Sequence, residues 1–387
     1  MRFKGYPKNF WIICFALLFF MISFNIILPE LNTFITRLGG ADKKGLIISL
    51  FTISALISRP FSGKLSDLIG RKKVMIIGII VAIVVTLTYP MSGLILFLSL
   101  RFMHGFSAGF LPTGATALVT DILPASKRGI GMGIWGTFIS VGIGAGQIFS
   151  SPIMNLGGLN LLFIIAGVLA GVAAIMIGFL KETLPNPQKF KWSFLKITRA
   201  DIMEPSVIPA AVVMFCSAIS TGIVFVITPD ISGYLGIENK GWFFGFYMIS
   251  TIFIRLFASG LSDVIGRRKT LIIGLSFMII SMTTIAFSET ILMYTIGSVI
   301  FGLSTGISSP TLFAWTADLS HIDRRGVGAG TLFIALEFGI MIGSFSTLLT
   351  YNNSFTSVPF VFIFGAIFAL IAIVYLVWHL LKRTSAT

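Results

Sequence analysis

Charged side chains are scarce in this protein: Asp, Glu, Lys and Arg together make up only 11% of its 387 residues. Soluble domains usually carry about 25% charged residues, so this chain lacks the side chains that normally cover a water-facing surface. Hydrophobic residues make up 56% of the sequence, and the mean hydropathy is +0.98. These values predict that lipid, rather than water, surrounds most of the folded chain.

Cysteine and histidine are also rare, with two and three copies respectively. Cys14 and Cys216 both fall within apolar runs, so they cannot build a disulfide framework and show no metal-ligand spacing. The sequence contains no pattern typical of a nucleophile triad, a metal cluster or a phosphate-binding loop. We therefore expect no enzyme, no catalytic residues, no cofactor and no metal ligands.

The formal net charge is +14, because Lys and Arg outnumber Asp and Glu by 28 to 14. A basic balance can indicate nucleic acid, but no soluble segment here combines a basic face with interleaved aromatic residues. The positive residues lie instead in short gaps between apolar runs, as topology signals of membrane proteins do. We therefore exclude nucleic acid as a partner and expect a lipid bilayer.

Twelve apolar runs are long enough to cross a membrane, because a helix needs about 20 residues to span the hydrocarbon core. Helices are expected because backbone groups in lipid must be satisfied within the segment. The predicted spans cover residues 10–33, 45–63, 74–92, 94–118, 129–152, 159–180, 206–229, 241–260, 270–288, 290–316, 327–350 and 357–381.

The positive residues also predict the orientation of the chain. Most Lys and Arg lie in the two terminal tails and in every second gap, whereas four lie in the other gaps and three within spans. Because cytoplasmic loops carry the excess of Lys and Arg, both termini are predicted to be cytoplasmic. The exceptions in the outer gaps are Arg37, Lys43, Lys44 and Lys240, and those within spans are Arg59, Arg101 and Arg255.

One charged segment occurs twice. Residues 63–73, GKLSDLIGRKK, recur as residues 259–269, SGLSDVIGRRK, in the equivalent gap of the second half. Further pairs recur at similar spacing, and because each half crosses six times the two copies have the same orientation. We predict two parallel six-helix bundles, 1–180 and 206–387, joined by a cytoplasmic linker, 181–205. Phe190, Trp192, Phe194 and Leu195 of the linker are expected to lie on the membrane surface.

These motifs resemble the Major Facilitator Superfamily, and within it the twelve-helix drug:proton antiporters. Residues 63–73 match the loop signature Gly-x-Leu-(Ser/Ala)-Asp-x-x-Gly-(Arg/Lys)-(Arg/Lys), and the second copy departs from it only at Ser259. The fourth span is similar to the buried-arginine motif through Arg101 and Gly105, with His104 where the family often has glutamine. The fifth span departs from the antiporter pattern, because Gln147 replaces its proline and two serines replace its glycine pair.

The resemblance implies a secondary active transporter that works by alternating access, with the two bundles rocking around a central site. Proton-coupled efflux of small amphipathic molecules or drugs is the first expectation. The divergent fifth span leaves open a proton-coupled importer of a nutrient, metabolite or sugar, and a receptor or membrane enzyme is the least supported reading. We expect a monomer in a prokaryotic cytoplasmic (inner) membrane, with protons and a small-molecule substrate as its partners.

The duplicated residues are interpreted as gating machinery. Glycine permits a tight turn between the helices, and a carboxylate near the start of the next helix favours the positive end of its dipole. The resemblance implies that such loops latch the two halves when the cytoplasmic side is closed. The predicted latch residues are Gly63, Asp67, Gly70, Arg71, Asp121 and Arg59 in the first half, and Asp263, Gly266, Arg267, Asp318 and Arg255 in the second.

Ionisable residues at membrane depth are functional candidates by default. The candidates for proton coupling are Glu337 first, then Glu30 and Asp230, together with His104 and Arg101. Glu30 and Asp230 follow prolines at equivalent places in the two halves, and both could instead be interfacial residues next to water. Polar and aromatic residues within spans are weaker candidates for the substrate cavity: Asn25, Gln147, Phe24, Trp135, Tyr247 and Trp315.

Overall fold

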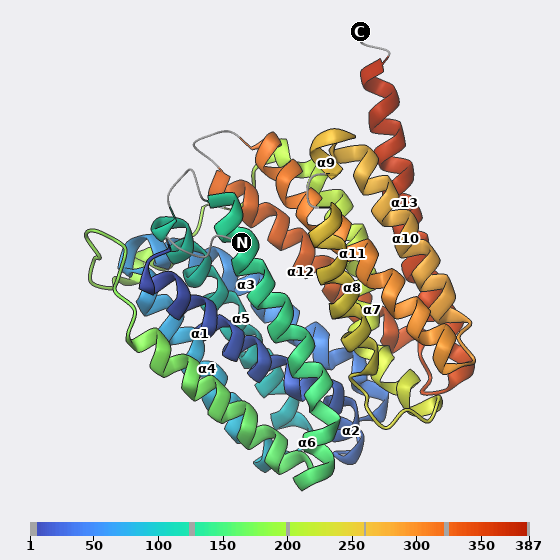
Figure 1. The fold of residues 1–387 in the computed structure, drawn as a ribbon. Coiled ribbons are helices and arrows are strands. Elements are labelled where there is room, and N and C mark those ends of the chain that lie inside the picture. The colour runs from blue at the N-terminus through green and yellow to red at the C-terminus, as the bar shows by residue number, and fades with distance from the viewer. Residues whose placement is uncertain (1–5, 124–127, 199–201, 259–260, 321–324, 385–387) are drawn as a thin grey trace. The chain divides into compact units, whose positions relative to one another are not determined.

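The computed structural model describes residues 6–123, 128–198, 202–258, 261–320 and 325–384. Within these ranges every regular element is a helix (Figure 1). They divide into two compact units, the first formed by residues 1–34 and 53–198 and the second by residues 35–52 and 199–387. The helical architecture confirms the prediction of an all-α fold.

The first unit takes its helices from the first half of the sequence. Helices α2 and α3 are shared, because residues 35–52 belong to the second unit. The elements from this half are α1 (Lys8–Ile27), η1 (Leu28–Glu30), α2 (Leu31–Arg37), α3 (Lys44–Ile69), α4 (Arg71–Thr88), η3 (Tyr89–Met91), α5 (Leu94–Ile122), α6 (Arg128–Gly178) and η5 (Trp192–Leu195), whereas η2 (Ala41–Lys43) belongs to the second unit.

The second unit contains the remaining helices. They are η7 (Pro205–Val207), α7 (Ile208–Tyr234), α8 (Trp242–Ala258), α9 (Leu261–Val264), α10 (Arg267–Ala286), α11 (Ile291–Leu319), α12 (Arg325–Thr350), η9 (Phe355–Ser357) and α13 (Val358–Thr384). Helix α7 packs against α12 and α13, α10 against α11 and α13, and α8 against α11.

Ten helices among the described residues are long and apolar enough to cross a membrane. One of them, within α6, runs for 45 residues, about twice what a single crossing needs. Helix α6 is interrupted at Gly157 and Gly158, where the backbone leaves the helical region and Gly158 takes a φ of 71°. Helix α8 contributes a shorter apolar segment, Trp242–Arg255.

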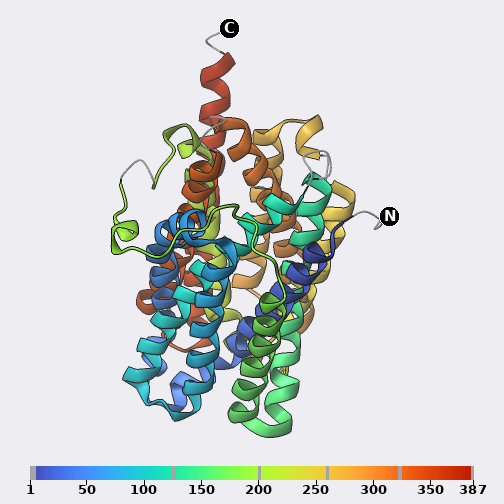
Figure 2. The ribbon, with the colours of Figure 1, turned by 90° about the vertical axis from the view of Figure 1, so that its left-hand side faces the viewer.

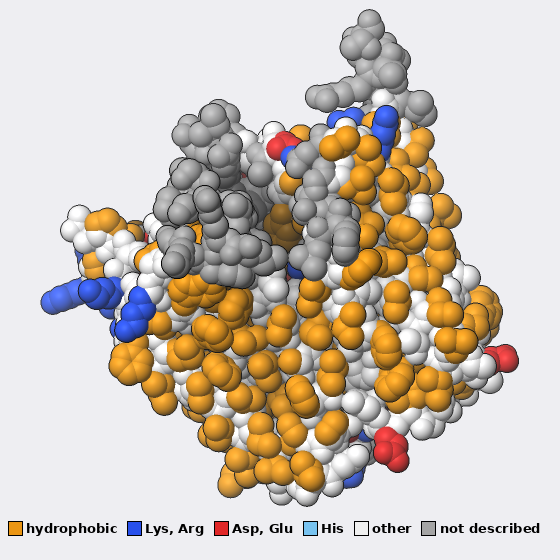
Figure 3. All heavy atoms as spheres, in the orientation of Figure 1, with side chains coloured by type: hydrophobic (Ala, Val, Ile, Leu, Met, Phe, Trp, Pro, Cys, Tyr) orange, Lys and Arg blue, Asp and Glu red, His pale blue; other side chains and the backbone are white. Residues whose placement is uncertain are grey.

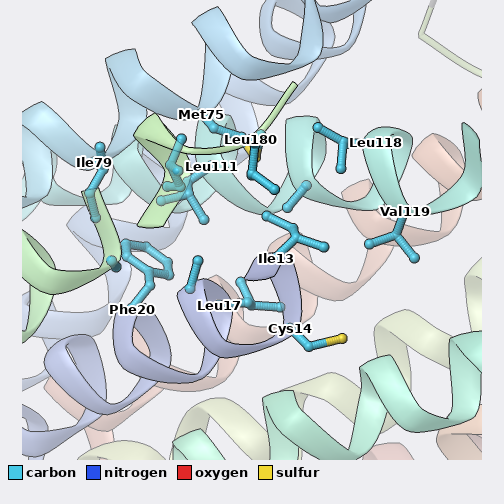
Figure 4. Close-up of a cluster of buried hydrophobic side chains, with 14 of the residues drawn as sticks. Ile13, Cys14, Leu17, Phe20, Met75, Ile79, Leu111, Leu118, Val119 and Leu180 are labelled. Carbon is cyan, nitrogen blue, oxygen red and sulfur yellow. The ribbon is translucent and has the colours of Figure 1, made fainter. Parts of the chain in front are cut away.

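The core of the first unit lies where α1 packs against α6 and α4 packs against α5. Buried apolar side chains of α1, α4 and α5, including Ile13, Leu17, Met75 and Leu111, gather in one cluster (Figure 4). Glycines let α6 approach α1 closely: a Cβ added at Gly146 would come within 2.9 Å of the Ile22 carbonyl oxygen. Side chains larger than hydrogen would therefore push the two helices apart.

Helices α7 and α12 repeat this close approach in the second unit. A Cβ at Gly339 or Gly343 would collide with the carbonyl oxygens of Phe215 and Ile219 on α7. The glycines lie four residues apart, so they face α7 from one side of α12. The same small-residue contact therefore recurs in both halves of the sequence.

Apolar side chains remain exposed along the outer faces of the helices, as Figure 3 shows for one face of the molecule. Ile77, Ile80, Val84 and Leu87 of α4 are each at least 38% exposed and follow one another at helical spacing. Exposed apolar stripes of this kind are stable only where lipid covers them. They identify the lipid-facing side of α4.

Candidate transport and gating sites

The first copy of the repeated loop forms a bonded turn between α3 and α4. Gly70 takes a φ of 118°, which non-glycine residues rarely adopt, and so allows the sharp turn. Arg71 follows directly, and its guanidinium donates to the Asp67 carboxylate at 2.5 Å and to the Ser66 carbonyl at 2.6 Å. It also reaches Asp121 on α5 at 3.2 Å. One arginine thus joins the ends of α3, α4 and α5.

Glu182, which the sequence analysis did not single out, completes this turn. Its carboxylate accepts hydrogen bonds from the backbone N–H groups of Arg71 at 3.0 Å and Lys72 at 3.1 Å. These N–H groups belong to the first turn of α4, where no intrahelical acceptor is available and the helix dipole favours an anion. The capping role expected of Asp67 therefore falls to Glu182, because Asp67 lies in the last turn of α3.

The linker contributes a second contact to the same network. The Thr183 hydroxyl donates to Asp121 at 2.7 Å, and Lys72 donates through its ammonium group to the carbonyls of Gly178 and Leu180. An acidic residue directly after Lys181, in a gap rich in positive residues, was the available sequence signal. Its partner, however, lies more than one hundred residues earlier in the chain.

The second copy of the loop keeps part of this arrangement. Gly266 takes a φ of 90°, and Arg267 donates to Asp318 on α11 at 2.9 Å and to the Ser262 hydroxyl at 2.7 Å. Asp263 lies in α9, but its side chain is outside the described residues. A Cβ added at Gly266 would meet no atom of the described residues within 4 Å, in contrast to Gly70.

The remaining predicted latch residues lie on the helices that lead to the loops. Arg59 and Gly63 belong to α3, and Arg255 lies near the end of α8. A Cβ at Gly63 would meet no neighbour within 4 Å in the described part of the chain, which therefore offers no packing reason for glycine here.

Arg101 and His104 meet at a buried polar group in the first unit. The Tyr89 hydroxyl of η3 lies 3.0 Å from Nδ1 of His104 and accepts from Arg101 at 3.4 Å. Arg101 is fully buried and His104 is 1% exposed. Phe24 of α1 places its ring edge-on to the imidazole, with 5.5 Å between centroids. The structure therefore brings three predicted residues together and adds Tyr89, for which the sequence offers no motif.

A second buried polar group joins α1, η1 and α6. The Gln147 amide donates to Asn25 Oδ1 at 3.0 Å, and the Ser151 hydroxyl donates to Glu30 at 2.8 Å. Glu30 also accepts from Thr33 at 3.3 Å and is only 2% exposed. Gln147 and Ser151, two of the three residues that break the antiporter pattern in the fifth span, are thus the ones that bond α1 and η1.

Asp230, the counterpart of Glu30, has a different environment in the second unit. It forms an ion pair with Lys44 at 2.5 Å, and both side chains are 12% exposed. The Tyr351 hydroxyl donates to Asp230 at 2.8 Å and lies 2.7 Å from the Tyr234 hydroxyl. Burial, together with the negative charge of Asp230, raises the pKa of Tyr351, so this hydroxyl keeps its proton.

The other candidates lie apart from these groups. Glu337 lies in α12 and is 8% exposed. Trp135 is buried in the core cluster of the first unit, and Trp315 lies under the Arg268 guanidinium at 5.8 Å. Tyr247 contacts the ring of Phe301 in an aromatic cluster of α8 and α11. Across the described residues, no three His, Cys, Asp or Glu side chains gather in a metal-binding arrangement.

Comparison with known proteins places these features in a family. The model of the Major Facilitator Superfamily matches residues 13–201 and 210–387. The chain is 28% identical to the multi-drug resistance efflux pump PmrA of Streptococcus pneumoniae, over 74% of this chain and 75% of that protein. It is 21% identical to the staphylopine export protein of Staphylococcus aureus, over 81% of this chain and 83% of that protein.

A solved structure shows the same fold. The human organic anion transporter MFSD10 superposes with a TM-score of 0.75 at 18% identity, covering 96% of this chain and 100% of that chain. The family match covers nearly the whole sequence and includes both loop copies. The chain therefore belongs to the Major Facilitator Superfamily, and it is a multi-pass membrane transporter rather than an enzyme.

Proposed function

We propose that this protein exports small amphipathic molecules or drugs in exchange for protons, by alternating access of two six-helix halves. The export direction is supported by PmrA and the staphylopine exporter, whose names describe outward transport and of which this chain covers three quarters or more. Import on the same fold is less supported, because its main argument was the divergent fifth span. The residues of that divergence, Gln147 and Ser151, have a bonding role within the first unit.

The proposed topology has twelve crossings with both termini cytoplasmic, in the cytoplasmic membrane of a prokaryotic cell, as a monomer. Ten apolar helices, a second arm of α6 beyond the Gly157–Gly158 break, and α8 support this number of crossings. We take residues 1–180 and 206–387 as the two halves and 181–205 as the linker. The repeated loops and the excess of positive residues beside them support this division.

Within this scheme Glu30 is the proposed proton carrier, and its bonding to hydroxyl groups is the observation that carries the assignment. Hydroxyl groups can donate to a carboxylate or accept from a carboxylic acid after rotation, so the contacts with Ser151 and Thr33 survive a change of protonation. Asp230 is less suited, because protonation would break its ion pair with the Lys44 ammonium. Glu337, the first choice from sequence, remains the second candidate.

Asp230 is better interpreted as part of a gate on the outer side. The Lys44–Asp230 pair ties the first residue of α3 to α7, and Ser49 contacts Ser344 of α12 at 2.9 Å in the same unit. We propose that these contacts separate when the outer side opens, while the Arg71 and Arg267 loops hold the cytoplasmic side at that stage. Arg101, His104 and Tyr89 are proposed to line the substrate route beside Phe24.

The test is a comparison of driven transport with exchange in proteoliposomes. Glu30→Gln keeps the shape of the side chain and its contacts but cannot release a proton. It should abolish substrate accumulation driven by a pH gradient, while exchange of labelled for unlabelled substrate continues. Glu289→Gln, an exposed carboxylate outside these sites, is the matched control. Gradient-driven accumulation that survives in Glu30→Gln would remove Glu30 from the mechanism.

A further inference from the structure

The linker is attached to the first unit at one side and exposed at the other. The backbone N–H of Gln188 donates to the Leu68 carbonyl at 2.8 Å, and the Lys64 ammonium donates to the Lys196 carbonyl at 2.6 Å. Phe194 and Leu195 pack on a buried cluster at the α3–α4 turn. Figure 2 shows the linker running across the ends of the helices of this unit. These contacts attach the linker to the first unit on both sides of residues 189–192.

Residues 189–192 turn away from that attachment. Phe190 and Trp192 are 48% and 81% exposed, and their rings stack edge to face with 5.5 Å between centroids. Lys189 and Lys191 alternate with them and are also exposed. Neither lysine has an ion-pair partner within the described part of the chain. All four residues were predicted to lie on the membrane surface. Phe194 and Leu195 instead pack against protein, whereas Phe190 and Trp192 are exposed.

The depth of this segment follows from α4. The linker is bonded to the first turn of α4, at Arg71 and Lys72. The first exposed apolar residue on α4 is Ile77, four residues beyond Lys73, which is about 6 Å along a helix. The lipid-facing stripe therefore begins just past the level of the linker. Gln188 is bonded to Leu68 in the last turn of α3, so residues 189–192 follow directly from an attachment at this end of the first unit.

We propose that Lys189, Phe190, Lys191 and Trp192 form a binding surface for anionic lipid headgroups of the cytoplasmic leaflet. Tryptophan is the side chain favoured at the boundary between headgroups and acyl chains, because its ring is apolar and its N–H is polar. The two ammonium groups bind phosphate or other anionic headgroup oxygens beside it. The bound lipid stabilises the attachment of the linker and, through Glu182 and Thr183, the bonded turn at Arg71. This inference does not depend on the substrate or on proton coupling.

The test measures quenching of tryptophan fluorescence by brominated lipid in reconstituted full-length protein. The contribution of Trp192 is the difference between the wild type and Trp192→Phe, with bromine atoms placed near the headgroup end of the acyl chain. Quenching should be stronger by brominated phosphatidylglycerol than by brominated phosphatidylcholine. The matched control is Trp378→Phe, because Trp378 is 50% exposed within the spanning part of α13 and should be quenched by both lipids alike.

Lysine variants test the charge recognition. Each lysine near an anionic surface contributes about 1 kcal/mol, or roughly fivefold in affinity, so Lys189→Gln with Lys191→Gln should lower the preference for phosphatidylglycerol by up to about 25-fold. Lys43→Gln, an exposed lysine of η2, should leave it unchanged. An equal response to both lipids, or an unchanged preference in the lysine variant, would overturn the proposal. Absence of quenching at Trp192 by either lipid would also overturn it and would indicate a water-facing segment or a soluble partner.

Discussion

Replacing Gly70 by alanine should destabilise the first unit more than the matched change at Gly266 destabilises the second. Both glycines have positive φ values, 118° and 90°, with ψ near 150°. Alanine in this region costs about 1–3 kcal/mol of backbone strain at either site. At Gly70 the new Cβ would also collide with the Glu182 carboxylate, whereas at Gly266 it would meet no described atom within 4 Å.

The additional cost at Gly70 can be estimated from the contacts that Glu182 would lose. Displacing its carboxylate weakens its hydrogen bonds to Arg71 and Lys72, and losing the equivalent of one such charged hydrogen bond costs about 1.5–3 kcal/mol. Each half has about 190 residues, a size at which 1 kcal/mol corresponds to roughly 2–4 °C in unfolding temperature. Gly70→Ala should therefore lower the unfolding temperature by about 3–12 °C more than Gly266→Ala.

Two buried thiols allow each unit to be followed separately. Cys14 lies in the first unit and Cys216 in the second, and both are buried. In single-cysteine versions of the protein, a thiol-reactive dye reports the temperature at which each unit opens. In a Glu182→Ala background, the excess fall in unfolding temperature of Gly70→Ala over Gly266→Ala should disappear, because no carboxylate remains to be displaced. Equal shifts for the two glycine variants, or an unchanged excess in the Glu182→Ala background, would refute the reasoning.

Three further outcomes follow from the polar contacts. Asp121→Asn should slow transport by loosening Arg71 and Thr183, and normal rates at normal surface expression would contradict the latch. Lys44→Asp and Asp230→Lys should each destabilise the second unit by about 1–3 kcal/mol, because each leaves a partly buried charge beside a like charge. The double exchange should restore stability, measured by thermal unfolding followed by circular dichroism. Burial raises the pKa of Tyr351 in the folded state, so folding stability should be constant through neutral pH and fall above about pH 10, where the unfolded tyrosine ionises. Tyr351→Phe should reduce that alkaline loss, and an identical pH profile would contradict the assignment.

The repeated loop shows how far the sequence alone could predict the structure. The spacing of Asp67, Gly70 and Arg71 is local, so a turn of opposite charges at a positive φ could be predicted from it. The pairing of Arg71 with Asp121 and of Arg267 with Asp318 became a reasonable expectation because both pairs recur in the two halves. Hydropathy predicted the helices for a similar reason, since each span satisfies its own backbone.

Contacts between distant helices could not be predicted in the same way. Glu182, unlike the Arg–Asp pairs, is not part of a pair that recurs in both halves of the sequence. Its role depends on how the end of α6 meets the start of α4. Glu30 and Asp230 occupy equivalent positions in the sequence but have different partners, because a serine of α6 faces one and Lys44 of α3 faces the other. Side-chain chemistry across helix interfaces is set by packing, which hydropathy and spacing do not specify.

The direction of coupled flux tests the central claim most directly. Purified protein in proteoliposomes would be given an imposed pH gradient, with labelled amphipathic substrate on one side and a pH-sensitive dye inside. The account predicts that substrate accumulates in the compartment from which protons leave, and that a protonophore abolishes this accumulation. Substrate that moves in the same direction as the protons, or accumulation that is indifferent to the gradient, would contradict a proton-coupled exporter.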